Sequence, residues 1–115
     1  YALGVYPDWW KLEPMTSDAA WHAACAAIAD HDPRCRGIVV LGLDAPEAAL
    51  AASFARAARH DLVRGFAVGR TIFGQAAQDW FAGRLDDEGA VAAMAARYAR
   101  LCALWDEARN QGDAP

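Results

Sequence analysis

The segment GIVVLGL at residues 37–43 decides the fold class of this chain of 115 residues. Its apolar side chains form a short continuous run that ends at Asp44 and Pro46. A run of this kind is typical of a strand that is buried on both faces, as strands in parallel sheets are. Neighbouring strands of a parallel sheet are joined by helices, so the flanking residues should supply both.

Two further apolar segments, at residues 9–12 and 63–68, have strand character and are bounded by Gly, Pro or Asp. Helical patterns fill the intervals. Thr16 and Ser17 are N-cap candidates for a helix that ends near residues 31–33, and Asp44 is a candidate cap for a helix that ends near His60. The three strands therefore recur roughly every 30 residues, which is the spacing of right-handed βαβ units.

Two more helices follow the third predicted strand. Residues 71–83 read as a short helix that ends at Gly83, and Asp86 opens the longest element of the chain. Apolar residues recur along it at spacings of three and four, which predicts an amphipathic helix docked on a core through Val91, Met94, Tyr98, Leu101 and Trp105. Residues 111–115 are polar, and we expect a disordered tail there.

Composition excludes several classes of protein. With 56% hydrophobic residues and a net charge of −4, the chain is neither disordered nor a nucleic-acid binder. Charged residues interrupt every apolar run, so we expect no membrane span. Three cysteines without a CxxC pair and three scattered histidines indicate no metal site, and we expect no cofactor. The chain starts at Tyr1 without a secretory signal, and we interpret it as a cytoplasmic piece of a longer protein.

The predicted fold is α/β. Three parallel strands in this order leave two edges unpaired, and a complete (β/α)8 TIM barrel needs about 200 residues or more. Residues 1–110 are therefore expected to form part of such a barrel, about three βα units. The alternative is a small open α/β sheet that is completed by a strand from residues 1–6 or by another subunit.

The first strand carries the only lysine of the chain, Lys11. Alternation along the strand places Lys11, Trp9 and Glu13 on one face. An amine held among tryptophans is costly to keep charged, which would lower its pKa and make it a nucleophile for a carbonyl group. The alternative is that Lys11 reaches solvent or pairs with Glu13 or Asp8.

The third strand ends in AVGRTIFG at residues 67–74. Gly69 permits close approach of the backbone, and the N–H groups at the start of the following helix favour a phosphate. Arg70 adds positive charge, and Gly42 at the end of the second strand could present another N–H group. Without a ligand, the same residues would form only a glycine-permitted turn between strand and helix.

At these positions the sequence resembles class I, Schiff-base aldolases, whose lysine lies in a segment like WKLEP and whose phosphate loop contains Gly-Arg. Three longer segments, at residues 4–14, 32–47 and 63–73, resemble the aldolase-like C-terminal domain of bacterial proteins of myo-inositol catabolism. In that family the domain is commonly fused behind 5-dehydro-2-deoxygluconokinase. The resemblance implies that residues 1–110 hold barrel strands six to eight, the C-terminal portion of the barrel. The N-terminal barrel half and the kinase domain of the same polypeptide would then be missing here, so that these residues alone would be inactive and poorly stable.

The implied reaction is cleavage of 2-deoxy-5-keto-D-gluconate 6-phosphate to dihydroxyacetone phosphate and malonate semialdehyde. Lys11 would form the Schiff base and Glu13 would tune or orient it. Gly42, Gly69 and Arg70 would hold the phosphate of the keto-sugar substrate.

Two other functions stay open. Independently of the function, we expect a homo-oligomer. The domain could bind a sugar phosphate without catalysis and regulate the attached kinase. It could also serve as an oligomerisation domain, with Trp80, Tyr98 and Trp105 as contacts.

Overall fold

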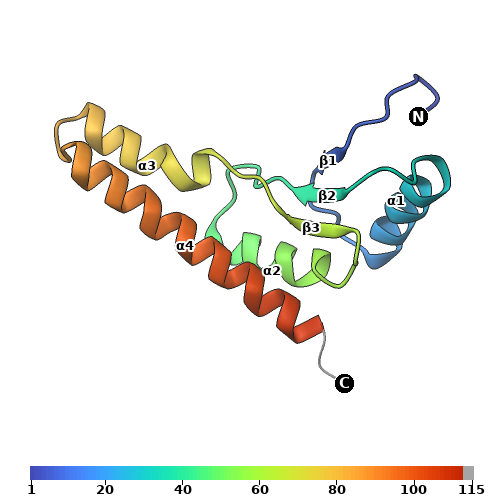
Figure 1. Cartoon of the computed structure of the whole chain (residues 1–115). Coiled ribbons are helices and arrows are strands. Elements are labelled where there is room, and N and C mark those ends of the chain that lie inside the picture. Colours follow the sequence, from blue (N-terminus) through green and yellow to red (C-terminus); the bar gives the residue numbers. More distant parts are fainter. Residues whose placement is uncertain (113–115) are drawn as a thin grey trace.

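A computed structural model describes residues 1–112 as a three-stranded parallel sheet with four helices (Figure 1). The predicted strand positions are confirmed, although the second and third strands end earlier than expected. The strands are β1 (Trp9–Leu12), β2 (Gly37–Val40) and β3 (Val63–Phe66). The helices are α1 (Asp18–His31), α2 (Glu47–Ala57), α3 (Arg70–Phe81) and α4 (Asp87–Gly112).

The strands lie in the order β1-β2-β3, and both pairs are parallel. Lys11 lies beside Val39, and Val39 lies beside Gly65 on the other side. Gly37 begins β2 with a φ of 144°, and a Cβ there would lie 2.7 Å from Arg64 Cγ and from the Leu62 carbonyl oxygen. The position therefore requires glycine both for its backbone conformation and for the approach of β3.

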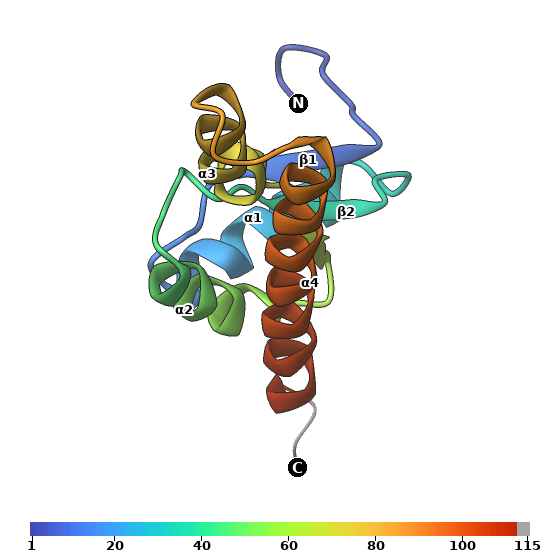
Figure 2. The same cartoon turned by 90° about the vertical axis from the view of Figure 1, so that its left-hand side faces the viewer.

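One face of the sheet is buried and the other is open. Figure 2 shows α1 and α2 on the same side of the sheet. The core lies on that side, and its fully buried large side chains are Trp21, Ile38, Val40, Leu50, Phe54, Val63 and Leu101. The opposite face carries Trp9, which is 46% exposed, and Lys11, which is also exposed. Within residues 1–112 no helix covers this second face.

The prediction of a partial TIM barrel over residues 1–110 is wrong. In a barrel each strand pairs on both sides, and a helix lies outside each strand. Among the residues described, only β2 has two neighbouring strands, and α3 and α4 pair with each other instead of each covering a strand. The sheet is open, as in the alternative weighed from the sequence, but residues 1–6 add no strand to it.

Of the predicted N-caps, Ser17 is confirmed and Asp44 is wrong. Ser17 caps α1, because its hydroxyl oxygen accepts a hydrogen bond from the Ala20 N–H at 3.2 Å. Asp44 does not cap α2, whose N-cap is Pro46 without a side-chain hydrogen bond. Instead, Leu43 and Asp44 adopt left-handed φ angles of 51° and 58° in the loop before α2.

The two halves of helix α4 pack on different elements. Figure 1 shows α3 beside its first half and α2 beside its second half. Leu101 and Trp105 are buried as predicted, whereas Val91 is 64% exposed and Tyr98 is 53% exposed. The first half of α4 packs mainly on α3, which leaves the predicted apolar stripe uncovered there.

Helix α4 continues through Gln111 and Gly112, two residues that the sequence analysis assigned to the tail. The rest of that predicted tail, residues 113–115, lies outside the described residues. None of the helices within residues 1–112 combines the length and the apolar character needed to cross a bilayer.

We predict that His60 makes the stability of the fold pH-dependent. Its side chain is 8% exposed, its Nε2 lies 4.0 Å from Asp18 Oδ1, and its ring lies 4.8 Å from that of His22. Burial, then the charges of His22 and Arg59, lower the pKa of His60 below its ordinary 6.5, while Asp18 opposes them. The neutral form is therefore favoured on folding, so stability is full above pH 6.5 and is lost as the pH falls below it.

Chemical denaturation between pH 7 and pH 5 should show a falling free energy of unfolding. His60→Gln should flatten that slope, and His31→Gln, at an exposed position, should leave it unchanged. An equal slope in wild type and His60→Gln would contradict the assignment.

Candidate functional site

A cavity of about 320 Å³ lies at the carboxyl ends of the strands. In parallel α/β sheets, ligands bind at this end. Four predicted site residues line it together, namely Lys11, Gly42, Gly69 and Arg70. Glu13, the fifth predicted residue, does not line it. The other lining residues are Leu41, Leu43, Asp44, Ala67, Val68, Thr71 and Phe73.

Lys11 reaches the cavity from β1, the edge strand. The alternation expected along β1 is confirmed, because Trp10 and Leu12 pack on the core while Trp9 and Lys11 lie on the open face. The expected apolar enclosure of Lys11 by tryptophans is not found, since its side chain is exposed and Trp10 turns away from it. Within residues 1–112 no carboxylate lies within 4.0 Å of its amine, including those of Asp8 and Glu13.

The start of α3 forms the opposite wall. Gly69 is its N-cap and offers no side chain to the first N–H groups, and the first turn contains no acidic residue. These N–H groups and the positive end of the helix dipole favour an anion. A Cβ on Gly69 would lie 3.2 Å from the ring of Phe73, so glycine also keeps the cavity wall open here. Arg70, the first residue of α3, brings a guanidinium to the same edge.

Asp44 also lines the cavity, although the sequence analysis expected it to cap a helix. Its Oδ2 lies 3.7 Å from Arg70 Nη1, and the two side chains are 54% and 72% exposed. An ion pair this exposed contributes little to stability. Its position matters more, because it places a carboxylate beside the one arginine of the cavity and would repel an anion. From the sequence, Asp44 was expected to repel a dianion at this place unless it capped a helix, and it does not cap α2.

Gly42 lets the ends of β2 and β3 approach each other. It is buried, and a Cβ there would lie 2.6 Å from Val68 Cγ1 and 3.3 Å from Thr71 Oγ1. Glycine at this position therefore sets the distance between the loop after β2 and the start of α3. We find this packing role for Gly42, whereas a contact between its N–H group and a phosphate stays a prediction.

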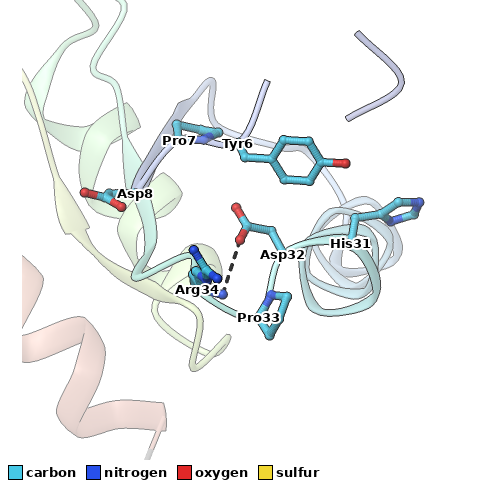
Figure 3. Close-up of a pocket in the computed structure, with 7 residues that line it drawn as sticks. All are labelled: Tyr6, Pro7, Asp8, His31, Asp32, Pro33 and Arg34. Atoms are coloured by element: carbon cyan, nitrogen blue, oxygen red, sulfur yellow. Dashed lines mark hydrogen bonds between the residues drawn. The ribbon is translucent and has the colours of Figure 1, made fainter. Parts of the chain in front are cut away.

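A second cavity, of about 350 Å³, lies where the chain enters β1 and β2 (Figure 3). Asp32 is buried beside it, and its Oδ1 accepts a hydrogen bond from the Arg34 N–H at 3.2 Å. Figure 3 shows His31 turned away from Asp32. The carboxylate of Asp32 thus orders the turn between α1 and β2, which is a structural task. Nowhere in residues 1–112 do three or more His, Cys, Asp or Glu side chains group in a way that could hold a metal ion.

We predict that Gly42→Ala destabilises the fold. The added methyl group would overlap Val68, and overpacking of this kind costs about 1–3 kcal/mol. Thermal denaturation should show a lower midpoint than wild type. Gly74→Ala is the matched control, because a Cβ there would meet only Arg70 Cβ at 3.9 Å, and an equal loss in both variants would contradict the packing role.

We also predict that Asp44→Asn strengthens the binding of inorganic phosphate at the cavity by several-fold. The substitution removes a negative charge beside Arg70 and releases its guanidinium. Calorimetry would measure the affinity. Asp30→Asn, an exposed change on α1 with the same loss of charge, should have no effect, and unchanged or weaker binding by Asp44→Asn would refute the prediction.

Comparisons with known proteins place the chain in a family but attach no activity to it. Neither the curated proteins nor the solved structures include a significant match. Residues 1–109 match a family described as uncharacterized protein conserved in bacteria, DUF2090. The match covers nearly the whole chain, and the chain therefore belongs to the bacterial DUF2090 family.

Proposed function

We propose that the cavity binds a phosphorylated keto compound and that Lys11 forms a Schiff base with its carbonyl carbon. The observation that carries the proposal is the meeting of Lys11 with Gly69 and Arg70 in one cavity. A primary amine and an anion-binding helix start on opposite walls suit a ligand with a carbonyl group at one end and a phosphate at the other.

The reaction would follow the class I aldolase scheme. The neutral amine of Lys11 attacks the ketone carbon, the ketone oxygen leaves as water, and an iminium forms. A hydroxyl group on the β-carbon loses its proton, the carbon–carbon bond breaks to release an aldehyde, and the electron pair passes into the iminium to give an enamine. Protonation of the enamine and hydrolysis by water then release the ketone product and restore Lys11.

Each predicted site residue has a place in this scheme. Gly69 and Arg70 would hold the phosphate, and Gly42 would support the same end of the cavity. Glu13 follows β1 two residues after Lys11 and does not line the cavity. We therefore propose that Glu13 makes no contact with substrate. Its carboxylate also lies more than 4.0 Å from the Lys11 amine, so it would influence Lys11 through its charge, without a direct contact.

The substrate proposal rests on the resemblance to the aldolase-like domain of myo-inositol catabolism proteins. It is cleavage of 2-deoxy-5-keto-D-gluconate 6-phosphate to dihydroxyacetone phosphate and malonate semialdehyde, in a bacterial cytoplasmic polypeptide that also carries 5-dehydro-2-deoxygluconokinase. Dihydroxyacetone phosphate has the ketone and the phosphate in one small molecule. It is therefore the simplest probe of both halves of the cavity.

A non-catalytic function is the second candidate, and the exposure of Lys11 favours it. A closed site protects a reactive imine from hydrolysis, whereas the side chain of Lys11 lies in contact with water. In this case the cavity would bind a sugar phosphate through α3 and Arg70, and Lys11 would serve only as a positive charge.

Reductive trapping separates the two candidates. We expect the protein to gain a covalent adduct on the peptide that contains Lys11 after incubation with dihydroxyacetone phosphate and borohydride. Lys11→Arg should gain none, because a guanidinium forms no imine, and Arg70→Ala should gain less because the phosphate is held less well. Trapping tests imine formation alone, so its outcome does not depend on complete turnover.

The outcomes are distinct. An adduct at Lys11 that requires Arg70 supports the Schiff-base function. Phosphate binding that persists in Lys11→Met, without an adduct in wild type, would establish the non-catalytic candidate instead. The absence of both an adduct and phosphate binding would refute both functions.

A further inference from the structure

An apolar groove of about 470 Å³ lies on the α3–α4 hairpin, away from the candidate site. Trp80 and Phe81 of α3 line one side, and Ala90, Val91 and Met94 of α4 line the other. Phe81 is 81% exposed and projects from the rim of the groove that it lines. Large apolar surfaces on soluble proteins mark interaction sites.

The hairpin is held firmly enough to present this groove. Trp80 Nε1 donates a hydrogen bond to Asp87 Oδ1 at 2.7 Å, which joins the end of α3 to the start of α4. Arg84 in the connecting turn donates from Nε to Asp79 Oδ1 at 2.8 Å. The first bond holds the ring of Trp80, and the ring of Phe81 packs edge-on to it at 4.9 Å between centroids.

The surface of the whole chain is larger than a compact monomer would have. It exposes 7332 Å², whereas a folded monomer of 12.4 kDa exposes about 6,100 Å². The radius of gyration is 16.4 Å, against about 13 Å for a compact domain of this length. The excess is larger than the roughly 800 Å² that one partner buries in a standard protein interface. It is shared between the open face of the sheet, the N-terminal segment and the groove, where Trp80, Phe81 and Val91 are exposed.

We propose that a second copy of this chain covers the groove, so that two α3–α4 hairpins pack as an antiparallel four-helix bundle. A two-fold axis brings the same surface of both copies together, which requires a surface that fits itself. The surface of the α3–α4 hairpin meets this requirement, because it carries both the groove and the exposed ring of Phe81. Phe81 of each copy would enter the groove of the other and pack beside Val91 and Met94.

The charges around the groove disfavour an anionic lipid surface. Asp86, Asp87 and Glu88 lie at the tip of the hairpin, and carboxylates are repelled by anionic headgroups.

The aromatic contact residues of the proposed interface differ from those expected from the sequence. Trp105 is buried in the core of its own chain, so of the three aromatic residues considered there only Trp80 and Tyr98 are exposed enough to contact another molecule.

Analytical ultracentrifugation of the full chain at high micromolar concentration tests the proposal. We expect a species of twice the chain mass for wild type and a single-chain species for Phe81→Glu, since a carboxylate cannot enter the apolar groove without a large desolvation cost. Val91→Glu, on the other helix, should act in the same way. Leu3→Glu is the control. Leu3 is 92% exposed, but it belongs to the N-terminal segment and is far from the hairpin in the sequence.

Circular dichroism of each variant should match wild type, which separates loss of association from loss of folding. A wild-type chain that remains monomeric would overturn the proposal, and sedimentation with neutral lipid vesicles in that case would identify a lipid surface as the occupant. A dimer that persists in folded Phe81→Glu and Val91→Glu would also overturn it. Dissociation by Leu3→Glu as well would show that the interface lies elsewhere.

Discussion

Contact among three aromatic rings holds the layers of this small fold together. Phe54 of α2 stacks on Phe66 of β3 at 5.0 Å between centroids, and Trp105 of α4 meets Phe54 edge-on at 5.4 Å. Aromatic pairs in such geometries stabilise beyond the area that they bury. The junction fixes the carboxyl end of β3, and Gly69 and Arg70 follow it within four residues. The position of the candidate site thus depends on a core contact made on the opposite face of the sheet.

The local elements could be predicted from the sequence because local chemistry determines them. Ser17 caps α1, the apolar runs mark the strands, and strand ends converge on one edge in any parallel sheet, so Lys11 and Arg70 meet as expected. The fold could not be predicted in the same way. The pattern of strands and helices is the same in an open sheet and in part of a barrel, and only the pairing of the outer edges of β1 and β3 distinguishes them.

Errors at single residues have the same origin. Helical periodicity shows that Val91 and Tyr98 share a stripe with Leu101, but it does not show where along α4 the sheet ends, so half of that stripe is exposed. Asp44 before Pro46 matches a capping pattern, yet its left-handed backbone turns it toward Arg70. Lys11 was expected to be enclosed because tryptophans flank it, although neighbours along a strand point to opposite faces.

Helix α3 links the two surfaces for which functions are proposed. Its N-cap, Gly69, and its first residue, Arg70, form one wall of the cavity. Its last residues, Trp80 and Phe81, form the rim of the groove. Between these ends α3 packs along α4, with Ala76 as its buried residue and the Thr71 carbonyl oxygen accepting a hydrogen bond from Arg97.

In the proposed dimer, the partner would contact the end of α3 that lies away from the cavity, an end that the hydrogen bonds of the hairpin already hold. No lining residue takes part in both surfaces, and one docked helix carries them at its two ends. Association and anion binding therefore depend on the same packing of α3 along α4, although each uses its own side chains.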